Sequence, residues 1–299
     1  MSAQLFVVQL FNGLQFGMML FLMAVGVTLV FGIMRIINLA HGSMFMLGGY
    51  FLAEAVARMH SLMLAITVTI IAIAIVGALL EFIVLRPLYG RSHLDQVLAT
   101  FGLTLIFNEA VTMVWGRDPI YLNIPDWLGG TVNLLPGVPY PIYRLAITAV
   151  SIVAGGLLYV LMNTTRIGAL IRAGSDKREI VEALGINIGM LYTLVFTLGA
   201  VLAAIAGMLT GPLLSVESGI GDPILILTLV VVVIGGMGSI RGALIGALLV
   251  GVFDTLSRVT LPMLFGGDAS SALVGMADYI LMAGVLLYRP TGLFKTGEG

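Results

Sequence analysis

A few polar side chains lie inside long apolar stretches of this sequence, and these residues could do chemistry. Asn108 and Glu109 are adjacent within one apolar run, and His41 lies in another, close to Asn38 and Ser43. A carboxylate or an imidazole in such surroundings could bind or pass a proton, since intramembrane polar groups are costly and are often retained for function. The same side chains could equally form hydrogen bonds between helices, and the sequence leaves both interpretations open.

Several other kinds of site are excluded by the residues that the sequence lacks. There is no cysteine, which excludes disulfides, thiol nucleophiles and thiolate metal sites. The three histidines (His41, His60 and His93) are too scattered to predict a metal site, and no G-x-x-x-x-G-K-[ST] phosphate loop occurs. The net charge of −1 and the lack of a basic cluster indicate no nucleic-acid partner. We therefore expect no catalytic residue, no metal and no cofactor bound by this chain.

Charge is densest in "TRIGALIRAGSDKREIVEALGIN", residues 165–187, which holds seven of the 29 charged residues (14 basic and 15 acidic). Asp176 is a plausible N-cap with Glu179 at the third helical position, and Gly185 suits the end of the short helix "KREIVEAL". A helix of two turns is marginal in water. It should therefore dock, either on its own chain or on a separate subunit, through an apolar face made of Ile180, Val181 and Leu184.

The elements that position these residues are predicted to be membrane helices. Hydrophobic residues make up 60% of the 299 and charged residues only 10%, whereas soluble domains carry about 25% charged residues. Mean hydropathy is +1.12, so most of the surface must face lipid. We expect an all-α integral membrane protein, a polytopic bundle of eight or nine segments of about 20 apolar residues. The segments are roughly 10–34, 41–57, 62–85, 94–116, 142–162, 189–211, 223–236, 242–260 and 273–288.

Three of these segments, 41–57, 223–236 and 273–288, are short and could be half-helices or re-entrant elements. The glycine-bearing stretches 32–49 and 234–242 each interrupt an apolar run, and broken segments in two halves of a transporter point to its passage region. Four acids, by contrast, lie nearer to predicted span ends, where head groups could solvate them: Glu54, Glu81, Asp254 and Asp278. The candidate pathway residues are Asn38, His41, Ser43, Asn108, Glu109, Gly235, Gly236 and Gly238.

The distribution of basic residues predicts the orientation. If 165–188 is cytoplasmic, alternation places ten basic residues inside and four outside, which supports that choice and a cytoplasmic C-terminus. The proline-rich stretch 116–141 then forms an external loop with a possible short strand pair. The ten inside are Arg35, Arg86, Arg91, Arg166, Arg172, Lys177, Arg178, Arg241, Arg289 and Lys295; the four outside are Arg58, Arg117, Arg144 and Arg258.

Three stretches together resemble a known family. "NLAHGSMFMLGGYF", "TRIGALIRAGSDKREIVEALGIN" and "VVVIGGMGSIRGALIGALLVG" occur in the order and spacing of the branched-chain (hydrophobic) amino acid ABC-transporter permeases, and the likeness is closest to the shorter of the two paired permeases. It covers nearly the whole chain. The resemblance implies a bacterial inner-membrane protein of the type II importer architecture, with residues 1–299 as one permease domain.

The resemblance also implies partners: a second related permease, two cytoplasmic ATPase subunits that carry ATP and Mg²⁺, and a periplasmic substrate-binding protein. The chain itself would not be an enzyme. "AGSDKREIVEALGI" (173–186) matches the loop through which such permeases meet their ATPases. The coupling residues that we expect here are Arg172, Asp176, Arg178, Glu179, Glu182, Ala183 and Gly185.

The expected function is a translocation pathway for branched-chain or other hydrophobic amino acids. Members of the resembling family also carry urea, short amides or other amino acids, and the sequence leaves the solute open. A stand-alone secondary transporter or channel is the second alternative, and it would need a mid-span site such as Asn108–Glu109 or His41. A membrane-embedded enzyme would need acids that pair at one depth, and none pairs along the sequence.

Overall fold

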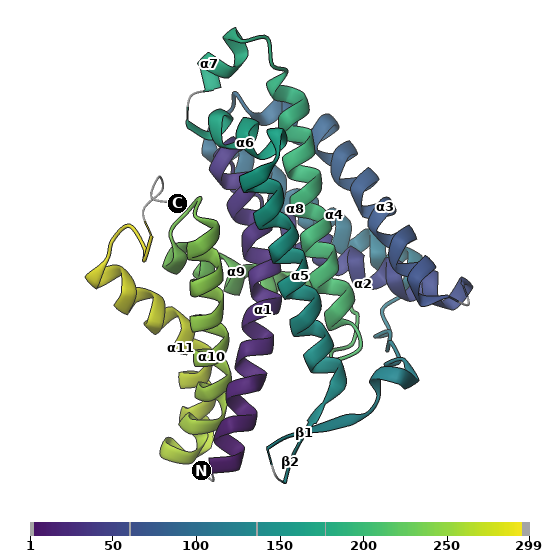
Figure 1. The fold of residues 1–299 in the computed structure, drawn as a ribbon, viewed down its shortest axis with the longest axis vertical. Coiled ribbons are helices and arrows are strands. Elements are labelled where there is room, and N and C mark those ends of the chain that lie inside the picture. Colours follow the sequence, from purple (N-terminus) through teal and green to yellow (C-terminus); the bar gives the residue numbers. More distant parts are fainter. Residues whose placement is uncertain (1–2, 60, 136, 177, 295–299) are drawn as a thin grey trace. The chain divides into compact units, whose positions relative to one another are not determined.

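The computed structural model describes residues 3–59, 61–135, 137–176 and 178–294, without the side chains of residues 3, 135, 176, 178–180 and 267–269. The described chain is mostly helical, as expected, and Figure 1 shows its elements. They are α1 (Ala3–Met34), α2 (His41–Arg58), α3 (Leu62–Leu80), the π-helical turn η1 (Glu81–Leu85), the 3₁₀ turn η2 (Arg86–Leu88), α4 (His93–Trp115), the 3₁₀ turn η3 (Asp126–Leu128), β1 (Thr131–Leu135), β2 (Val138–Pro141), α5 (Ile142–Thr164), α6 (Arg166–Asp176), α7 (Arg178–Ala183), α8 (Ile188–Thr210), α9 (Gly221–Gly235), α10 (Ile240–Phe265) and α11 (Gly267–Tyr288).

In the described part of the chain, seven helices are long and apolar enough to cross a membrane. They establish a multi-pass membrane protein. The apolar α9, with 15 residues, is shorter, and α2 is not apolar enough to count among the seven. The seven are Gln4–Met34, Leu62–Leu88, His93–Trp115, Ile142–Thr164, Ile188–Thr210, Ile240–Phe265 and Ser270–Tyr288.

One of the three segments expected to be short is not short. The sequence stretch 273–288 belongs to α11, which runs over 22 residues and includes a candidate span of 19. The difference arises because the first turn of α11 contains Asp268 and two serines, which interrupt the apolar pattern without interrupting the helix. That α2 and α9 are half-helices or re-entrant elements stays a prediction.

The chain divides into two compact units, whose boundaries fall inside α1, α5 and α9 and in the loop after α4. One unit comprises residues 1–24, 124–153 and 226–299, and the other comprises 25–123 and 154–225. The first unit contains α10, α11 and the β-hairpin; the second contains α2, α3, α4 and α6–α8. The expectation of a single permease domain stays a prediction.

Side-chain caps fix where several helices begin. Ser92 and Asp95 form a capping box at α4, in which the Ser92 hydroxyl accepts from the Asp95 N–H and the Asp95 carboxylate accepts from the Ser92 N–H. Asn187 caps α8 by accepting from the Met190 N–H at 3.0 Å. Ser239 caps α10 in the same way. These caps start the helices sharply after polar turns.

In the second unit, α2 packs against α8 and α3, and α3 also packs against α8. Glycines let α2 and α8 touch backbone to backbone. A Cβ on Gly207 would lie 1.9 Å from the Phe45 carbonyl oxygen, and one on Gly48 would lie 2.4 Å from that of Ala204. Such close crossings are typical of membrane helices. They explain why most residues of α2 are buried.

In the first unit, α10 packs against α11, and β1 pairs with β2 as an antiparallel hairpin in the predicted external stretch. Thr131 lies opposite Pro141, and a bulge follows Asn133. The hairpin confirms the strand pair expected there. The turn between α9 and α10 is held by the C-terminal segment, since Leu293 N–H donates to the Ile234 carbonyl at 2.8 Å.

Candidate functional site

The charge-rich segment contains two helices, α6 and α7, where the sequence predicted one. Residues 166–176 of the segment were not expected to be helical. Helix α6 packs through a stripe at three-residue spacing, Gly168, Ile171 and Gly174, all of which are buried. A Cβ on Gly168 would lie 2.2 Å from the Met162 carbonyl oxygen, so α6 folds tightly against the end of α5.

Helix α7 ends as the sequence predicted. Gly185 has φ +79°, a left-handed conformation that favours glycine. Its N–H donates to the Glu182 carbonyl and the Ile186 N–H donates to the Val181 carbonyl, which together form a Schellman motif. The predicted role of Gly185 as the residue after the helix is confirmed.

The end of α7 is anchored on one side and exposed on the other. Val181 is buried, and α7 contacts both α6 and α8. Glu182, Ala183 and Gly185 are exposed, and the apolar Leu184 is 73% exposed. The expected apolar face is therefore divided, because Val181 docks on the chain itself whereas Leu184 points away from it. The end of α7 and the turn after it present a small surface with one large apolar side chain, Leu184.

Other expected coupling residues lie partly or wholly outside the described residues. Arg172 is exposed and its Nη1 donates to the carbonyl of Met162, at the end of α5. Asp176 is the last residue of α6, and its side chain lies outside the description, as do those of Arg178 and Glu179. Lys177 lies outside it entirely. The capping box expected for Asp176 and Glu179 stays a prediction.

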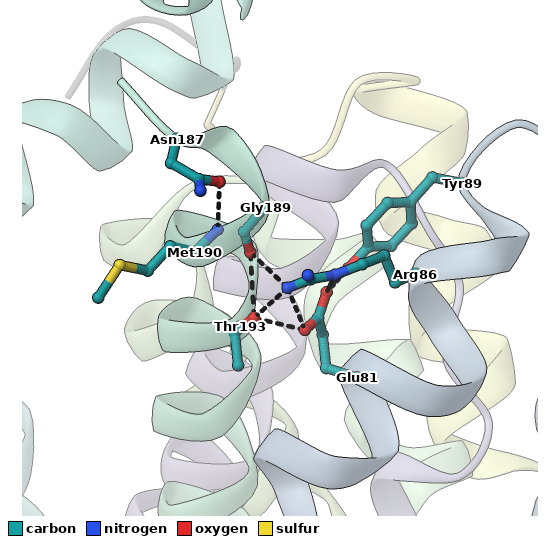
Figure 2. Close-up of polar contacts among 7 residues, drawn as sticks. All are labelled: Glu81, Arg86, Tyr89, Asn187, Gly189, Met190 and Thr193. Atoms are coloured by element: carbon teal, nitrogen blue, oxygen red, sulfur yellow. Dashed lines mark hydrogen bonds and ion pairs between the residues drawn. The ribbon is translucent and has the colours of Figure 1, made fainter. Parts of the chain in front are cut away.

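Beside the start of α8 lies a polar cluster that the sequence did not predict (Figure 2). The carboxylate of Glu81, in η1, is fully buried and pairs with Arg86, whose Nη2 lies 3.2 Å from Oε2. The same Nη2 donates to the Gly189 carbonyl at 3.1 Å and to the Thr193 hydroxyl at 2.7 Å. Thr193 in turn donates to Glu81, and Tyr89 donates to its other oxygen. These five residues are called the Glu81 cluster below.

In the Glu81 cluster, the charge of the buried carboxylate is balanced by a cation and by hydrogen-bond donors. The Arg86 guanidinium also lies over the Phe82 ring, 4.7 Å from its centroid. Burial, together with the hydrogen bond to Glu81, raises the pKa of Tyr89 above its usual range, so the phenol holds its proton even more firmly than an exposed tyrosine does. Each Glu81 oxygen therefore has at least one donor, which is what a buried carboxylate requires.

The residues expected at the first break of the chain are buried within the second unit. Asn38, His41 and Ser43 are at most 6% exposed. The Asn38 side-chain oxygen accepts from the Ala40 N–H at 3.0 Å, just before α2 begins. The structure thus gathers these residues around the first turn of α2, and their place in a pathway stays a prediction.

The adjacent pair Asn108 and Glu109 does not form a single site. Asn108 is half-buried and donates to Asp222, in the first turn of α9, at 3.2 Å, whereas Glu109 is exposed. The cause is geometric, since consecutive residues of a helix point in directions about 100° apart. The structure joins Asn108 to an acid 114 positions away instead of its neighbour.

Backbone conformation accounts for the glycine cluster between α9 and α10. Gly236 and Gly238 have φ of +101° and +88°, which a tight turn between two helices requires. A Cβ on Gly235 would lie 2.3 Å from the Gly242 carbonyl oxygen, so α9 and α10 touch at this point. A role for these three glycines in a pathway stays a prediction.

The first unit holds an acidic pair that sequence reasoning missed. Asp254 and Asp278 lie near the middle of α10 and α11, not near span ends as expected, and both are about 95% buried. The two side chains lie close enough to interact electrostatically. Arg258 Nε lies 2.8 Å from Asp254 Oδ2, and Asp278 Oδ1 has no hydrogen-bond partner in the described structure. Among the described residues, no group of three or more His, Asp or Glu side chains could hold a metal ion.

Comparison with known proteins places the sequence among transport permeases. The family described as "Branched-chain amino acid transport system / permease component" matches residues 9–288. The branched-chain amino acid permease BraD of Pseudomonas aeruginosa is 32% identical over 97% of this chain and 96% of its own. The corresponding LivH of Escherichia coli is 29% identical over 98% and 96%. The ribose import permease RbsC of Escherichia coli is 28% identical over 82% and 76%. No solved structure matches the chain.

Proposed function

The chain belongs to the branched-chain amino acid transport permease family, and on that premise we propose that it is the membrane-spanning permease subunit of an ATP-driven importer. It forms the translocation pathway for branched-chain amino acids, which a periplasmic binding protein delivers. The relatives named for this transport match almost the full length of both chains, which supports the same role here.

The architecture proposed is that of a type II importer permease in the bacterial inner membrane. The seven long apolar helices, with α2 and α9 as shorter segments between them, would give nine membrane segments. With 165–188 on the cytoplasmic side, the C-terminus is cytoplasmic and the β-hairpin is periplasmic. Alternation through nine segments then places the N-terminus on the periplasmic side.

The observation that carries the coupling proposal is the exposed end of α7 and the turn after it. Glu182, Ala183, Leu184 and Gly185 are exposed while Val181 holds the helix to the chain. A protruding apolar side chain on an anchored turn suits docking into a partner's groove. We assign this surface to a cytoplasmic ATPase, with a second ATPase on a related permease. ATP and Mg²⁺ belong to those partners, and this chain binds no cofactor and hydrolyses nothing.

The first test is assembly. The full chain is purified in mild detergent with its co-expressed membrane and ATPase partners, and the complex is weighed. We expect two ATPase subunits in the wild-type complex and their loss in the Glu182→Arg/Gly185→Arg double variant. The matched control is Tyr121→Arg, on an exposed side chain in the predicted periplasmic loop, which should leave the complex intact. Equal recovery of ATPases by the double variant and the control would contradict the assigned surface.

The second test is the solute. The complex is reconstituted with its binding protein, and uptake of labelled leucine, isoleucine and valine is compared with that of urea, acetamide and ribose. The ribose comparison matters because a similar chain is named for ribose import. We expect ATP-dependent uptake of the three branched-chain amino acids. Uptake of another solute alone would support the proposal of an ATP-driven importer and contradict the proposed substrate.

A second candidate function is a stand-alone secondary transporter, favoured by the buried pair Asp254 and Asp278. Carboxylates at mid-helix in a membrane are candidates for ion or proton sites. This candidate predicts that the purified chain alone moves solute in liposomes without ATP, and that Asp254→Asn abolishes the movement. If the purified chain moves no solute in the absence of the ATPases, the stand-alone transporter is contradicted.

A further inference from the structure

The exposed segment joins the membrane helices of the second unit at two places, the end of α5 and the start of α8. Helix α8 begins five residues after α7 ends, and both α6 and α7 contact it. The Ile186 N–H is bonded to the Val181 carbonyl, and Asn187 caps α8. The connection is therefore short and hydrogen-bonded along its length, and it leaves little slack between α7 and the first turn of α8.

That first turn of α8 is tied to the end of α3 by the Glu81 cluster (Figure 2). Arg86 donates to Gly189 and Thr193, which lie 103 and 107 positions away, and Thr193 donates to Glu81, 112 positions away. These hydrogen bonds involve two charged groups, and Glu81 is fully buried. Sliding α8 against η1 would leave a buried carboxylate short of donors, which is strongly disfavoured.

The ion pair between Glu81 and Arg86 can form because η1 is a π-helical turn. Arg86 lies five residues after Glu81, and the Arg86 N–H donates to the Glu81 carbonyl across the π-turn. In an α-helix, residues five apart lie on different faces. The wider turn brings them together, and π-turns of this kind are often found at functional sites. Rewinding η1 to an α-helix would pull Arg86 away from Glu81.

We propose that Glu81, Arg86 and Thr193 form a transmission link that carries displacement of the α6–α7 segment into α3. The proposal rests on the proposed function, because the displacement comes from an ATPase docked on α7. The three side chains act as positioning residues, since they hold the first turn of α8 and the end of α3 together as one body. Helix α3, packed on α2 and α8, then moves with α8 when the transporter changes state.

The test uses the reconstituted complex with both permeases, both ATPases and the binding protein. Amino acid uptake and ATP hydrolysis are measured together, with and without loaded binding protein. We expect Thr193→Val to assemble and to keep basal hydrolysis, but to lose uptake per ATP by about fivefold or more, which is the scale of a typical coupling between sites. Thr193→Ser keeps the hydroxyl and should restore the ratio.

The matched control is Thr197→Val, one helical turn later on α8 and also half-buried, for which the ratio should stay at the wild-type value. A purely structural role of Thr193 would reduce the amount of complex without changing uptake per ATP. A wild-type ratio in Thr193→Val would therefore overturn the proposal.

A second measurement does not depend on the stability of these variants. The chain has no cysteine, so spin labels can be attached at Ile83→Cys in η1 and Met190→Cys in α8, both exposed and both outside the cluster. If the two ends form one body, the distance between the labels stays the same in the ATP-free and ATP-trapped complexes. A change of that distance between the two states would overturn the proposal.

The failures of the two proposals are distinguishable. A wild-type complex without ATPases or without ATP-dependent uptake contradicts the proposed function. A wild-type complex that couples normally, with Thr193→Val indistinguishable from it, contradicts only the transmission link.

Discussion

Each unit has a group in which an arginine pairs with a buried carboxylate, and the two groups differ. The second unit has the Glu81 cluster, and the first unit has Asp254, Arg258 and Asp278. In the Glu81 cluster, one carboxylate receives donors from Arg86, Tyr89 and Thr193. In the other group, Arg258, whose side chain is 58% exposed, pairs with Asp254, and Asp278 lies beside that pair. One oxygen of Asp278 has no partner in the described structure.

The difference lies in how each arginine reaches its acid. Arg258 is four residues after Asp254, which an ordinary α-helix brings together. Arg86 is five residues after Glu81 and needs the π-turn. The ordinary pair joins residues of one helix, and within this group it is Asp278 that comes from the neighbouring helix α11. The unusual pair reaches across to α8, so the distorted helix gains a connection between distant parts of the chain.

The largest expected effect is the loss of Arg86, and it should exceed that of Arg258. Arg86→Leu leaves Glu81 buried without a cation, and we expect a loss of about 3–5 kcal/mol in the free energy of unfolding. Arg258→Leu should cost only about 1–2 kcal/mol, because the Arg258 side chain is largely exposed and the ion pair is weakened by solvent. Thermal unfolding of the two variants in the same detergent checks the order. Equal losses would show that the clusters are equivalent.

A smaller effect is expected from the phenol of the Glu81 cluster. Tyr89→Phe removes one donor to a buried carboxylate, which should cost about 1–3 kcal/mol. The control, Tyr159→Phe on an exposed α5 side chain, should be neutral within about 0.5 kcal/mol. If Tyr89→Phe were as stable as the control, Glu81 would not depend on that hydroxyl, and the network would be less closed than its geometry indicates.

The smallest expected effect separates the two carboxylate environments most cleanly. Asp278→Asn replaces one of two adjacent acids with an amide that can donate to Asp254, so its stability should stay within about 0.5 kcal/mol of wild type or rise. Glu81→Gln removes the negative charge to which Arg86 and two hydroxyls donate, and should lower the free energy of unfolding by about 1–3 kcal/mol. A more destabilising Asp278→Asn would reverse the contrast between the saturated and unsaturated clusters.

Much of the fold follows from the sequence. Each of the nine expected apolar runs coincides with a helix, and the strand pair and the Gly185 terminus occur where turn chemistry predicted them. The helices could be predicted from the length of the apolar runs and from the polar residues that separate them, since a helix that crosses a bilayer must be long and apolar. Helix α6 was missed because Arg166 and Arg172 break the apolar pattern, although glycines pack its other side.

The side-chain partners could not be predicted in the same way. A helix such as α3 is apolar all round, because lipid and protein interior are both apolar, so its sequence gives no sign of which face is buried. The meeting of Asp254 with Asp278 and of Asn108 with Asp222 depends on helix rotation. The pairing of Glu81 with Thr193 likewise has no sequence signal, since the two residues are 112 positions apart.

The backbone contact of α2 with α8 has a consequence for how the protein is made. Helix α2 is not apolar enough to be a strong span alone, and Gly207, the glycine that receives it, belongs to a helix that ends at Thr210. At about 5–20 residues per second, a ribosome needs roughly 8–30 s to pass from the end of α2 to the end of α8. During that interval α2, with His41 and Ser43, has no α8 to cover it. Biosynthesis must shelter it until then, against α1 and α3 or within the insertion machinery.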